Sequence, residues 1–408
     1  MKIKCIIAAL AALCLSGMPA AAQGAGEGAA ERPGLAVRAG ADRMTIGSFR
    51  DTYTSLGFNS FALGCDFVTR GDAGSFSAAY NRPIFTIGLT YNTLDDVIFR
   101  SGRGHYSPMV TAYAGIGRDL LRYGPFSLGY DLALGLSYSD GYYNPLTNAS
   151  NWFFSSPVLF HAAGGGHITW QLARRLDLIA DISVRHCSSA RFAYPNGGLN
   201  YWGGGLSARY HFQDRKPALS KGVRTPRISD ELYEKGWNYE IYAGGGVHAC
   251  AAEWLAMTKT VDKETQAATT LRRWPMGSLG FDAIYRLNGR FGAGATANAF
   301  YCSNTEMLRR ADGVIYSEEE AAASSYAPFS FGIGAVQEIF YRRTALYLQE
   351  GYYLYRKAGI HADHGRIYER AGLRLYPKSI EPFFISVCIK AHRFKADYMD
   401  FTIGLRFK

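Results

Sequence analysis

The sequence has few charged residues and no long hydrophobic run beyond its N-terminus. Charged residues make up 19% of the 408 residues, below the roughly one quarter that is usual in soluble domains. After residue 22 there is no run of about 18 apolar residues, the length that a membrane-spanning helix requires. The mean hydropathy is only −0.10. A bundle of membrane-spanning helices is therefore excluded.

The chain also has only seven cysteines. Those that follow residue 22 are odd in number and widely separated, which argues against a disulfide scaffold. No two of them have the spacing of zinc ligands, so we expect neither a metal nor another cofactor. These cysteines are Cys65, Cys187, Cys250, Cys302 and Cys388.

Aromatic residues and glycine are abundant, with 28 Tyr, 24 Phe, 6 Trp and 46 Gly. This content excludes a disordered chain and leaves soluble all-β folds and membrane β-barrels. The net charge of +10 is compatible with nucleic acid, but no basic block with interleaved aromatics is present. We therefore expect no nucleic-acid partner and an anionic lipid surface instead.

The N-terminus predicts export. Residues 1–4 include the two lysines Lys2 and Lys4, residues 5–15 are apolar, and residues 20–22 are three alanines that precede Gln23. This is the pattern of a secretory signal peptide, so we expect residues 1–22 to be cleaved. Residues 23–45 are expected to form an N-terminal segment ahead of the first folded unit.

Side chains alternate between apolar and small or polar along many segments. In residues 126–139 every second residue is a large apolar one, beginning at Phe126 and ending at Tyr138, and the residues between them are small or charged. This period of two is typical of a membrane barrel strand with lipid outside and a polar lumen inside. Residues 398–408 show the same alternation and end in Phe407-Lys408, which resembles the terminal signal of bacterial outer-membrane barrels.

The alternation predicts an all-β fold with about sixteen antiparallel transmembrane strands. Long polar loops alternate with short turns, as in such barrels. A charged segment at 213–237 divides the strands into two sets of eight, so we expect two eight-stranded barrels at 46–212 and 238–408. One larger barrel is the alternative, and a soluble sandwich is a third. The expected strands are 57–67, 75–81, 84–92, 107–118, 126–139, 157–172, 176–190 and 200–212, then 238–254, 272–287, 291–302, 326–341, 344–356, 366–376, 382–392 and 398–408.

Several polar residues are expected inside the barrels. His161 and His167 share one face of their strand and are interpreted as hydrogen-bonded interior groups. The second half contains no catalytic pattern, and its role is left open. Its charged residues are expected to face the lumen and to pair or bind water: Asp282, Arg286, Arg290, Glu338, Glu350 and Arg406.

Three polar residues interrupt an apolar, lipid-facing surface. His186 and Ser188 continue the apolar face of the strand at 176–190, and Asn200 lies on the same face of the next strand. A serine hydroxyl becomes a nucleophile when a neighbouring imidazole takes its proton, and a third polar group orients that imidazole. Spacing alone favours a simpler interpretation, a polar rim satisfied by headgroups and water.

The longer sequence at 185–200 favours the catalytic interpretation over the polar rim. It runs Arg-His-Cys-Ser-Ser-Ala-Arg-Phe-Ala-Tyr-Pro-Asn-Gly-Gly-Leu-Asn and resembles the lipid A 3-O-deacylase (PagL) family of outer-membrane esterases, or acyloxyacyl hydrolases. The resemblance covers 46–212 loosely and 185–202 closely. In that family an eight-stranded barrel bears a His-x-Ser pair and, after a Pro-Asn-x-Gly turn, an acidic residue. The resemblance implies Ser188 as nucleophile, His186 as general base and residue 200 as the orienting group.

The sequence departs from the family at three positions. Asn200 replaces a glutamate, Ser189 replaces an asparagine associated with the oxyanion hole, and Arg191 replaces a glycine whose amide would donate. Asparagine can orient a histidine but cannot stabilise an imidazolium by charge. Donors to the oxyanion are then expected nearby, at Ser189, Asn196, Gly197 and Gly198.

The resemblance implies an outer-membrane serine esterase that removes an ester-linked acyl chain from lipid A. Its partner is then lipopolysaccharide in the outer leaflet, and the protein is an integral protein of the bacterial outer membrane. The alternative is a non-enzymatic barrel with a structural or transport role, in which the three polar residues are a rim.

Overall fold

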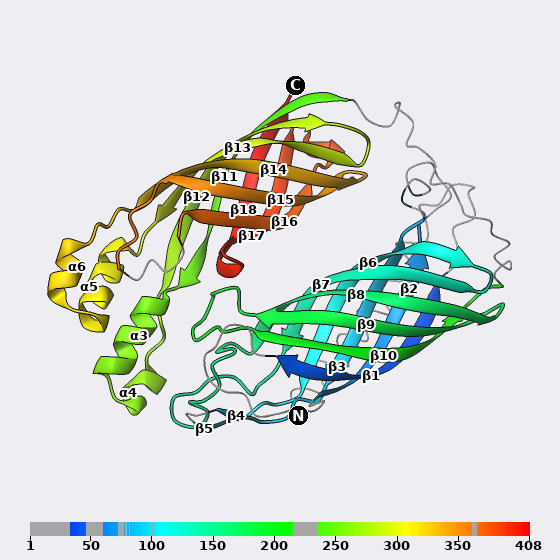
Figure 1. Cartoon of the computed structure of the whole chain (residues 1–408), viewed down its shortest axis with the longest axis horizontal. Coiled ribbons are helices and arrows are strands. Elements are labelled where there is room, and N and C mark those ends of the chain that lie inside the picture. The colour runs from blue at the N-terminus through cyan, green and yellow to red at the C-terminus, as the bar shows by residue number, and fades with distance from the viewer. Residues whose placement is uncertain are drawn as a thin grey trace. The chain divides into compact units, whose positions relative to one another are not determined.

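The computed structural model describes residues 33–45, 60–71, 77, 80, 82–99, 102–214, 235–360 and 365–408. It consists of two closed, antiparallel, eight-stranded barrels (Figure 1). The prediction of an all-β fold with two eight-stranded units is confirmed, and the alternative of one larger barrel is wrong. The predicted signal peptide at 1–22 and residues 215–234 of the predicted linker lie outside the described residues.

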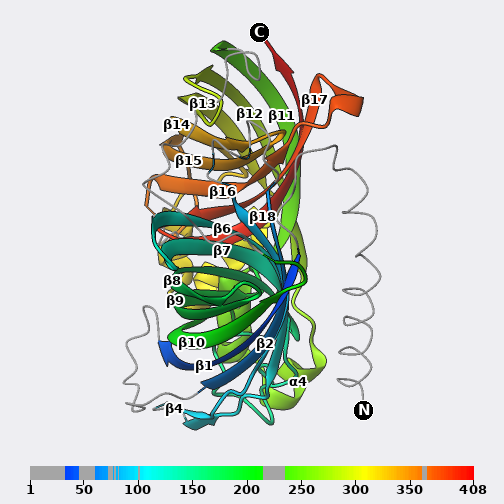
Figure 2. The ribbon, with the colours of Figure 1, turned by 90° about the vertical axis from the view of Figure 1, so that its right-hand side faces the viewer.

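The first barrel closes by pairing its first strand with both its second and its last. Its order is β1-β10-β9-β8-β7-β6-β3-β2, with β2 paired to β1, and in both views β10 lies between β1 and β9 (Figure 2). The short strands β4 and β5 form a separate hairpin. The strands are β1 (Gly34–Thr45), β2 (Ser60–Arg70), β3 (Ile84–Asn92), β4 (Val97–Phe99), β5 (Gly102–Gly104), β6 (Met109–Tyr123), β7 (Phe126–Tyr138), β8 (Val158–Ala173), β9 (Leu176–Ser188) and β10 (Leu199–His211).

Strand β1 corrects the predicted start of this barrel. It lies in the segment 23–45 that was expected to precede the folded unit. Its outward row includes the small Ala39 and Ala41 and the charged Arg43, so its apolar signal is weak. The strand expected at 75–81 falls largely outside the described residues, and the described Ser77 and Tyr80 are not in a strand.

The second barrel has its strands in sequence order, from β11 to β18, and β18 pairs with β11 to close it. Two connections that were expected to be plain polar loops, 255–271 and 303–325, carry helices. No helix in the described ranges is both long and apolar enough to span a membrane. The elements are β11 (Gly236–Ala249), α3 (Ala251–Thr260), α4 (Lys263–Ala268), β12 (Arg273–Arg286), β13 (Phe291–Cys302), α5 (Thr305–Ile315), α6 (Glu318–Ala323), β14 (Phe329–Tyr341), β15 (Thr344–Tyr355), β16 (Ile367–Leu375), η2 (Lys378–Ile380), β17 (Phe383–His392) and β18 (Lys395–Phe407).

The chain divides into two compact units. The first comprises Met1–Tyr142, Pro157–Ser188 and Gly198–Arg227, and the second comprises Tyr143–Ser156, Ser189–Gly197 and Ile228–Lys408. The first barrel thus belongs to one unit and the second barrel to the other. The segments at 143–156 and 189–197, which connect strands of the first barrel, are counted with the second unit.

Both barrels place apolar side chains outside and polar side chains inside. On β7 the outward residues from Phe126 to Leu136 are between 37% and 52% exposed. The interior of the first barrel holds buried ion pairs, such as that of Arg185 Nη1 with Asp42 Oδ2 at 2.5 Å. A surface of exposed large apolar side chains is unfavourable in water and is the outer face expected of a membrane barrel.

The interior of the second barrel is filled by charged groups that neutralise each other. The predicted interior residues Asp282, Glu338 and Arg406 are confirmed, because Arg374 pairs with Asp282 at 2.7 Å and Arg406 with Glu338 at 2.8 Å. The prediction for Glu350 is wrong. The Glu350 side chain is exposed because Tyr347 and Gln349 set the inward row of β15. Arg290, which was also expected inside, lies in the turn between β12 and β13.

Candidate active site

His186 and Asn200 meet on the outer surface of the first barrel. They are direct partners in the antiparallel pairing of β9 with β10, and His186 Nδ1 lies 2.7 Å from Asn200 Oδ1. The amide oxygen can only accept, so Nδ1 carries the hydrogen and donates it. The other ring nitrogen, Nε2, is then left as an acceptor. This is the tautomer that a general base requires.

Ser188 is the last residue of β9 and follows His186 by two positions. Alternation along a strand places residues i and i+2 on the same face, which here is the outer face. The histidine is exposed, whereas Ser188 is only 5% exposed. The hydroxyl is therefore shielded from bulk solvent at the end of the strand.

Gly198 packs directly against the imidazole. A Cβ placed on this residue would lie 2.7 Å from His186 Cε1 and 3.5 Å from Nε2, and contacts below about 3 Å are not tolerated by close-packed atoms. Gly198 also has a φ of +74°, in the left-handed region that glycine adopts most readily. Both features require glycine here. Its backbone limits the rotation of the histidine ring, a role that was not predicted.

The residues that flank His186 on β9 point into the barrel and anchor the strand. Arg185 pairs with Asp42 on β1, and Cys187 Sγ lies 3.3 Å from His161 Nδ1 on β8. Cys187 is fully buried. These anchors hold the strand so that His186 faces outward. They were not predicted because the Asp42 contact depends on the pairing of β1.

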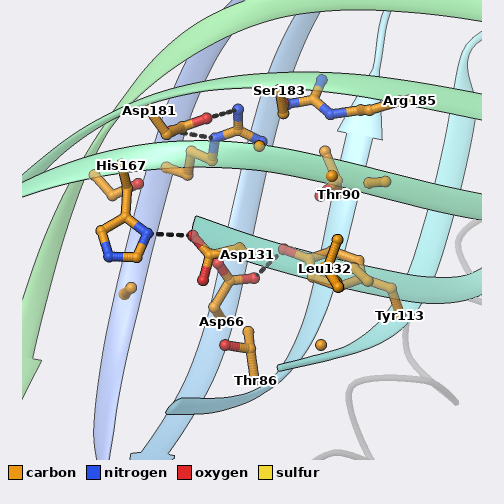
Figure 3. A pocket seen from close by; sticks show the side chains of 18 of the residues that line it. Asp66, Thr86, Thr90, Tyr113, Asp131, Leu132, His167, Asp181, Ser183 and Arg185 are labelled. Carbon is orange, nitrogen blue, oxygen red and sulfur yellow. Dashed lines mark hydrogen bonds and ion pairs between the residues drawn. The ribbon is translucent and has the colours of Figure 1, made fainter. Parts of the chain in front are cut away.

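A polar cavity of about 140 Å³ lies inside the first barrel behind this strand. Figure 3 shows His167 against Asp131 and Asp66 against Tyr113. Asp66 accepts from the Tyr113 hydroxyl at 2.5 Å, and Arg38 pairs with Asp181 in the same cavity. The prediction that His161 and His167 are hydrogen-bonded interior groups is confirmed. The paired side chains that line the cavity thus stabilise the barrel wall from inside. The polar residues of the candidate site lie on the outside of the same wall.

The predicted oxyanion donors fall in both compact units. Gly198 belongs to the first, while Ser189, Asn196 and Gly197 belong to the second. The Ser189 amide donates to Asn196 Oδ1 at 2.9 Å, and the Ser189 hydroxyl donates to the Ala193 carbonyl at 3.1 Å. Both groups thus hold the segment 189–197 in shape. The assignment of an oxyanion hole remains a prediction.

One comparison with known proteins falls on the second barrel. Residues 237–408 match the family model described as "Acyloxyacyl hydrolase, C-terminal domain". This match covers less than half of the chain. The family suspected from the string at 185–200 of the first barrel is thereby confirmed, although the match falls on the half for which no role was predicted. No curated protein matches the chain.

Three solved structures align with this chain at low similarity. Neisserial surface protein A (NspA) is 14% identical, with 45% of this chain and 99% of that protein aligned and a TM-score of 0.30. The outer membrane enzyme PagL is 11% identical, with 43% and 97% aligned and a TM-score of 0.28. The copper transporter OprC is 11% identical, with 93% and 69% aligned and a TM-score of 0.25.

Proposed function

We propose that this protein is an outer-membrane serine esterase that removes an ester-linked acyl chain from lipid A or a related acylated glycolipid. The observation that carries the proposal is the 2.7 Å contact between His186 Nδ1 and Asn200 Oδ1 on the apolar outer surface of the barrel. A polar rim would not need an oriented imidazole two positions along the strand from a shielded serine. The hydrolase family of residues 237–408 supports the same reaction class.

In the proposed reaction, His186 moves protons and Ser188 carries the acyl group. Nε2 takes the proton of the Ser188 hydroxyl as Oγ attacks the ester carbonyl. The tetrahedral intermediate collapses, the sugar oxygen leaves with the proton that Nε2 returns, and the acyl group stays on Oγ. His186 then deprotonates a water molecule, which attacks the acyl ester. The products are a free fatty acid, the deacylated glycolipid and regenerated Ser188.

The location of the site fits a lipid substrate. His186 is surrounded on the outer face by exposed apolar side chains such as Val184 and Trp202, and in a membrane these would contact acyl chains. The ester of an acylated glycolipid lies near the boundary between chains and headgroup. A site near the end of an apolar strand surface is therefore at a suitable depth for it.

The interior of the second barrel does not favour a channel. Arg370 and Asp400 are both fully buried and pair at 2.6 Å, and further buried ion pairs lie beside them. Because breaking such pairs is costly, the paired charges fill the interior of the barrel and do not line an open channel. A transport function for this barrel therefore has no support in the described residues.

The proposal is tested by the lipid A of cells that express the protein. In a Gram-negative host with fully acylated lipid A, mass spectra are expected to show a new species that is lighter by one acyl chain. Cells with an empty vector provide the control. Identical spectra, with the protein present and folded in the outer membrane, would establish the non-enzymatic alternative.

Substitution of Gly198 tests the packing of the imidazole. Gly198→Ala is expected to lower kcat for ester hydrolysis about 10²-fold, because the added Cβ displaces the His186 ring and small misplacements in an active site have effects of this size. Gly166→Ala on β8 is the matched control, since a Cβ there meets nothing closer than 3.5 Å. Equal rates for both variants would show that the Gly198 contact does not position the base.

A further inference from the structure

Arg43 on β1 is a charged residue on the apolar outer surface of the first barrel. Its neighbours Asp42 and Met44 are almost completely buried and point inward, so alternation places the half-buried Arg43 outward. Among the outward-facing strand residues of this barrel that the structure describes, one other carries a permanent charge. That residue is Arg118 on β6, near the turn to β7 at the other end of the barrel.

The strand pairing brings Arg43 close to the candidate site. Arg43 is paired with Trp202 on β10, and two residues further toward the site the backbone of Thr45 is paired with Asn200. Asn200 in turn is paired with His186 on β9. Arg43 is thus two strands away from His186, which is about 10 Å across the sheet, and two residues away along the strand direction, which is about 7 Å. The long arginine side chain shares one outer surface with the imidazole.

Arg43 has no partner in the part of the chain that the structure describes. No hydrogen bond, ion pair or ring contact joins it to another residue there. The other arginines near this site differ, since Arg38 pairs with Asp181 and Arg185 with Asp42. An arginine on the lipid face of a barrel is destabilising at the membrane centre and much less so near the interface. An unpaired cation on this surface thus has an unused capacity to bind an anion.

We infer that Arg43 is a specificity-determining residue that binds a phosphate group on the headgroup of the lipid whose ester is presented to Ser188. The inference rests on the proposed function. A guanidinium group has planar, paired donors that match a phosphate better than an ammonium group does. With the ester at Ser188 and the phosphate at Arg43, the two contacts fix which acyl chain of the headgroup is cleaved.

The test measures lipid binding with hydrolysis removed. All proteins carry Ser188→Ala, and the probes are lipid A with its phosphates and the same lipid A after dephosphorylation, both in detergent micelles. Arg43→Gln is expected to raise Kd about 10- to 100-fold for the phosphorylated lipid and to leave Kd for the dephosphorylated lipid unchanged. Arg43→Lys retains part of the affinity. Arg118→Gln, the matched control, changes neither value.

Two results would overturn the inference. If Arg43→Gln changes Kd equally for both lipids, or for neither, Arg43 does not bind the headgroup phosphate. If inorganic phosphate alone binds saturably and Arg43→Gln abolishes that binding, the residue serves a free anion and not a lipid. Far-ultraviolet circular dichroism confirms that each variant is folded.

The outcome is separable from that of the proposed function. If the chain with an intact Ser188 never hydrolyses lipid A while Arg43→Gln selectively weakens binding of the phosphorylated form, the esterase proposal fails and the phosphate contact stands. If hydrolysis occurs and the phosphate dependence is absent, the phosphate contact fails and the esterase proposal stands.

Discussion

Ser188→Ala is expected to abolish the release of fatty acid from lipid A, with a loss of about 10³-fold or more in kcat. Without the Oγ nucleophile no acyl-enzyme forms, and any residual rate depends on water activated by His186. Ser188 lies at the end of β9, so the barrel is expected to fold normally. The rate is measured as fatty acid released by purified protein in detergent.

A control on the same strand separates chemistry from structure. Ser183 points into the barrel and lines the interior cavity, so Ser183→Ala removes a hydroxyl from β9 without touching the outer surface. This variant is expected to keep the wild-type rate. A Ser188→Ala protein that still releases fatty acid at the wild-type rate would show that Ser188 is not the nucleophile.

The strand pattern could be predicted because one face of each strand is apolar and the other is small or polar. On β9 the alternation fixed which residues face outward, and His186 and Asn200 were expected on the same surface of neighbouring strands. Their direct pairing follows from that register. The periodicity of two therefore carries much information about which side chains can meet across a barrel wall.

Strand β1 could not be recognised in the same way. Its outward row contains small and charged residues, and its inward row contains Arg38, Gly40 and Asp42. Gly40 lies so close to β10 that a Cβ there would be 2.7 Å from the Gly204 carbonyl oxygen. Such contacts join residues that are more than 140 positions apart in the sequence, and a local pattern does not reveal them. The anchoring of Arg185 by Asp42 was missed for this reason.

The start of helix α6 in the second barrel is marked in the sequence by its N-cap residue Ser317. Ser317 accepts from the Glu320 amide at 3.1 Å, which is the N-cap bond of a Ser-x-x-Glu helix start, and its hydroxyl donates to the Glu320 carboxylate. The string Ser-Glu-Glu-Glu at 317–320 was visible in the sequence. By contrast, the contact of Gly198 with His186 depends on the exact path of a loop, for which glycine gives no specific sign.

Asn200→Asp is expected to raise kcat for ester hydrolysis about 10²-fold. The two side chains have the same shape, so the 2.7 Å contact with His186 Nδ1 can be kept while the neutral acceptor becomes a carboxylate. In a serine protease the opposite change, from aspartate to asparagine, lowers the rate about 10⁴-fold, in part because the histidine adopts the wrong tautomer. Here Asn200 already presents its oxygen to Nδ1. The gain is therefore limited to the charge that stabilises the imidazolium.

The prediction is checked by comparing three proteins at saturating lipid A: the wild type, Asn200→Asp and Asn200→Ala. The alanine variant is expected to be slower than the wild type, because the ring loses the acceptor that fixes its tautomer. The order Asp, Asn, Ala in kcat, with a similar KM for all three, identifies residue 200 as the orienting group. If the aspartate variant is no faster than the wild type, no imidazolium develops beside residue 200 in the rate-limiting step, and His186 is not the general base.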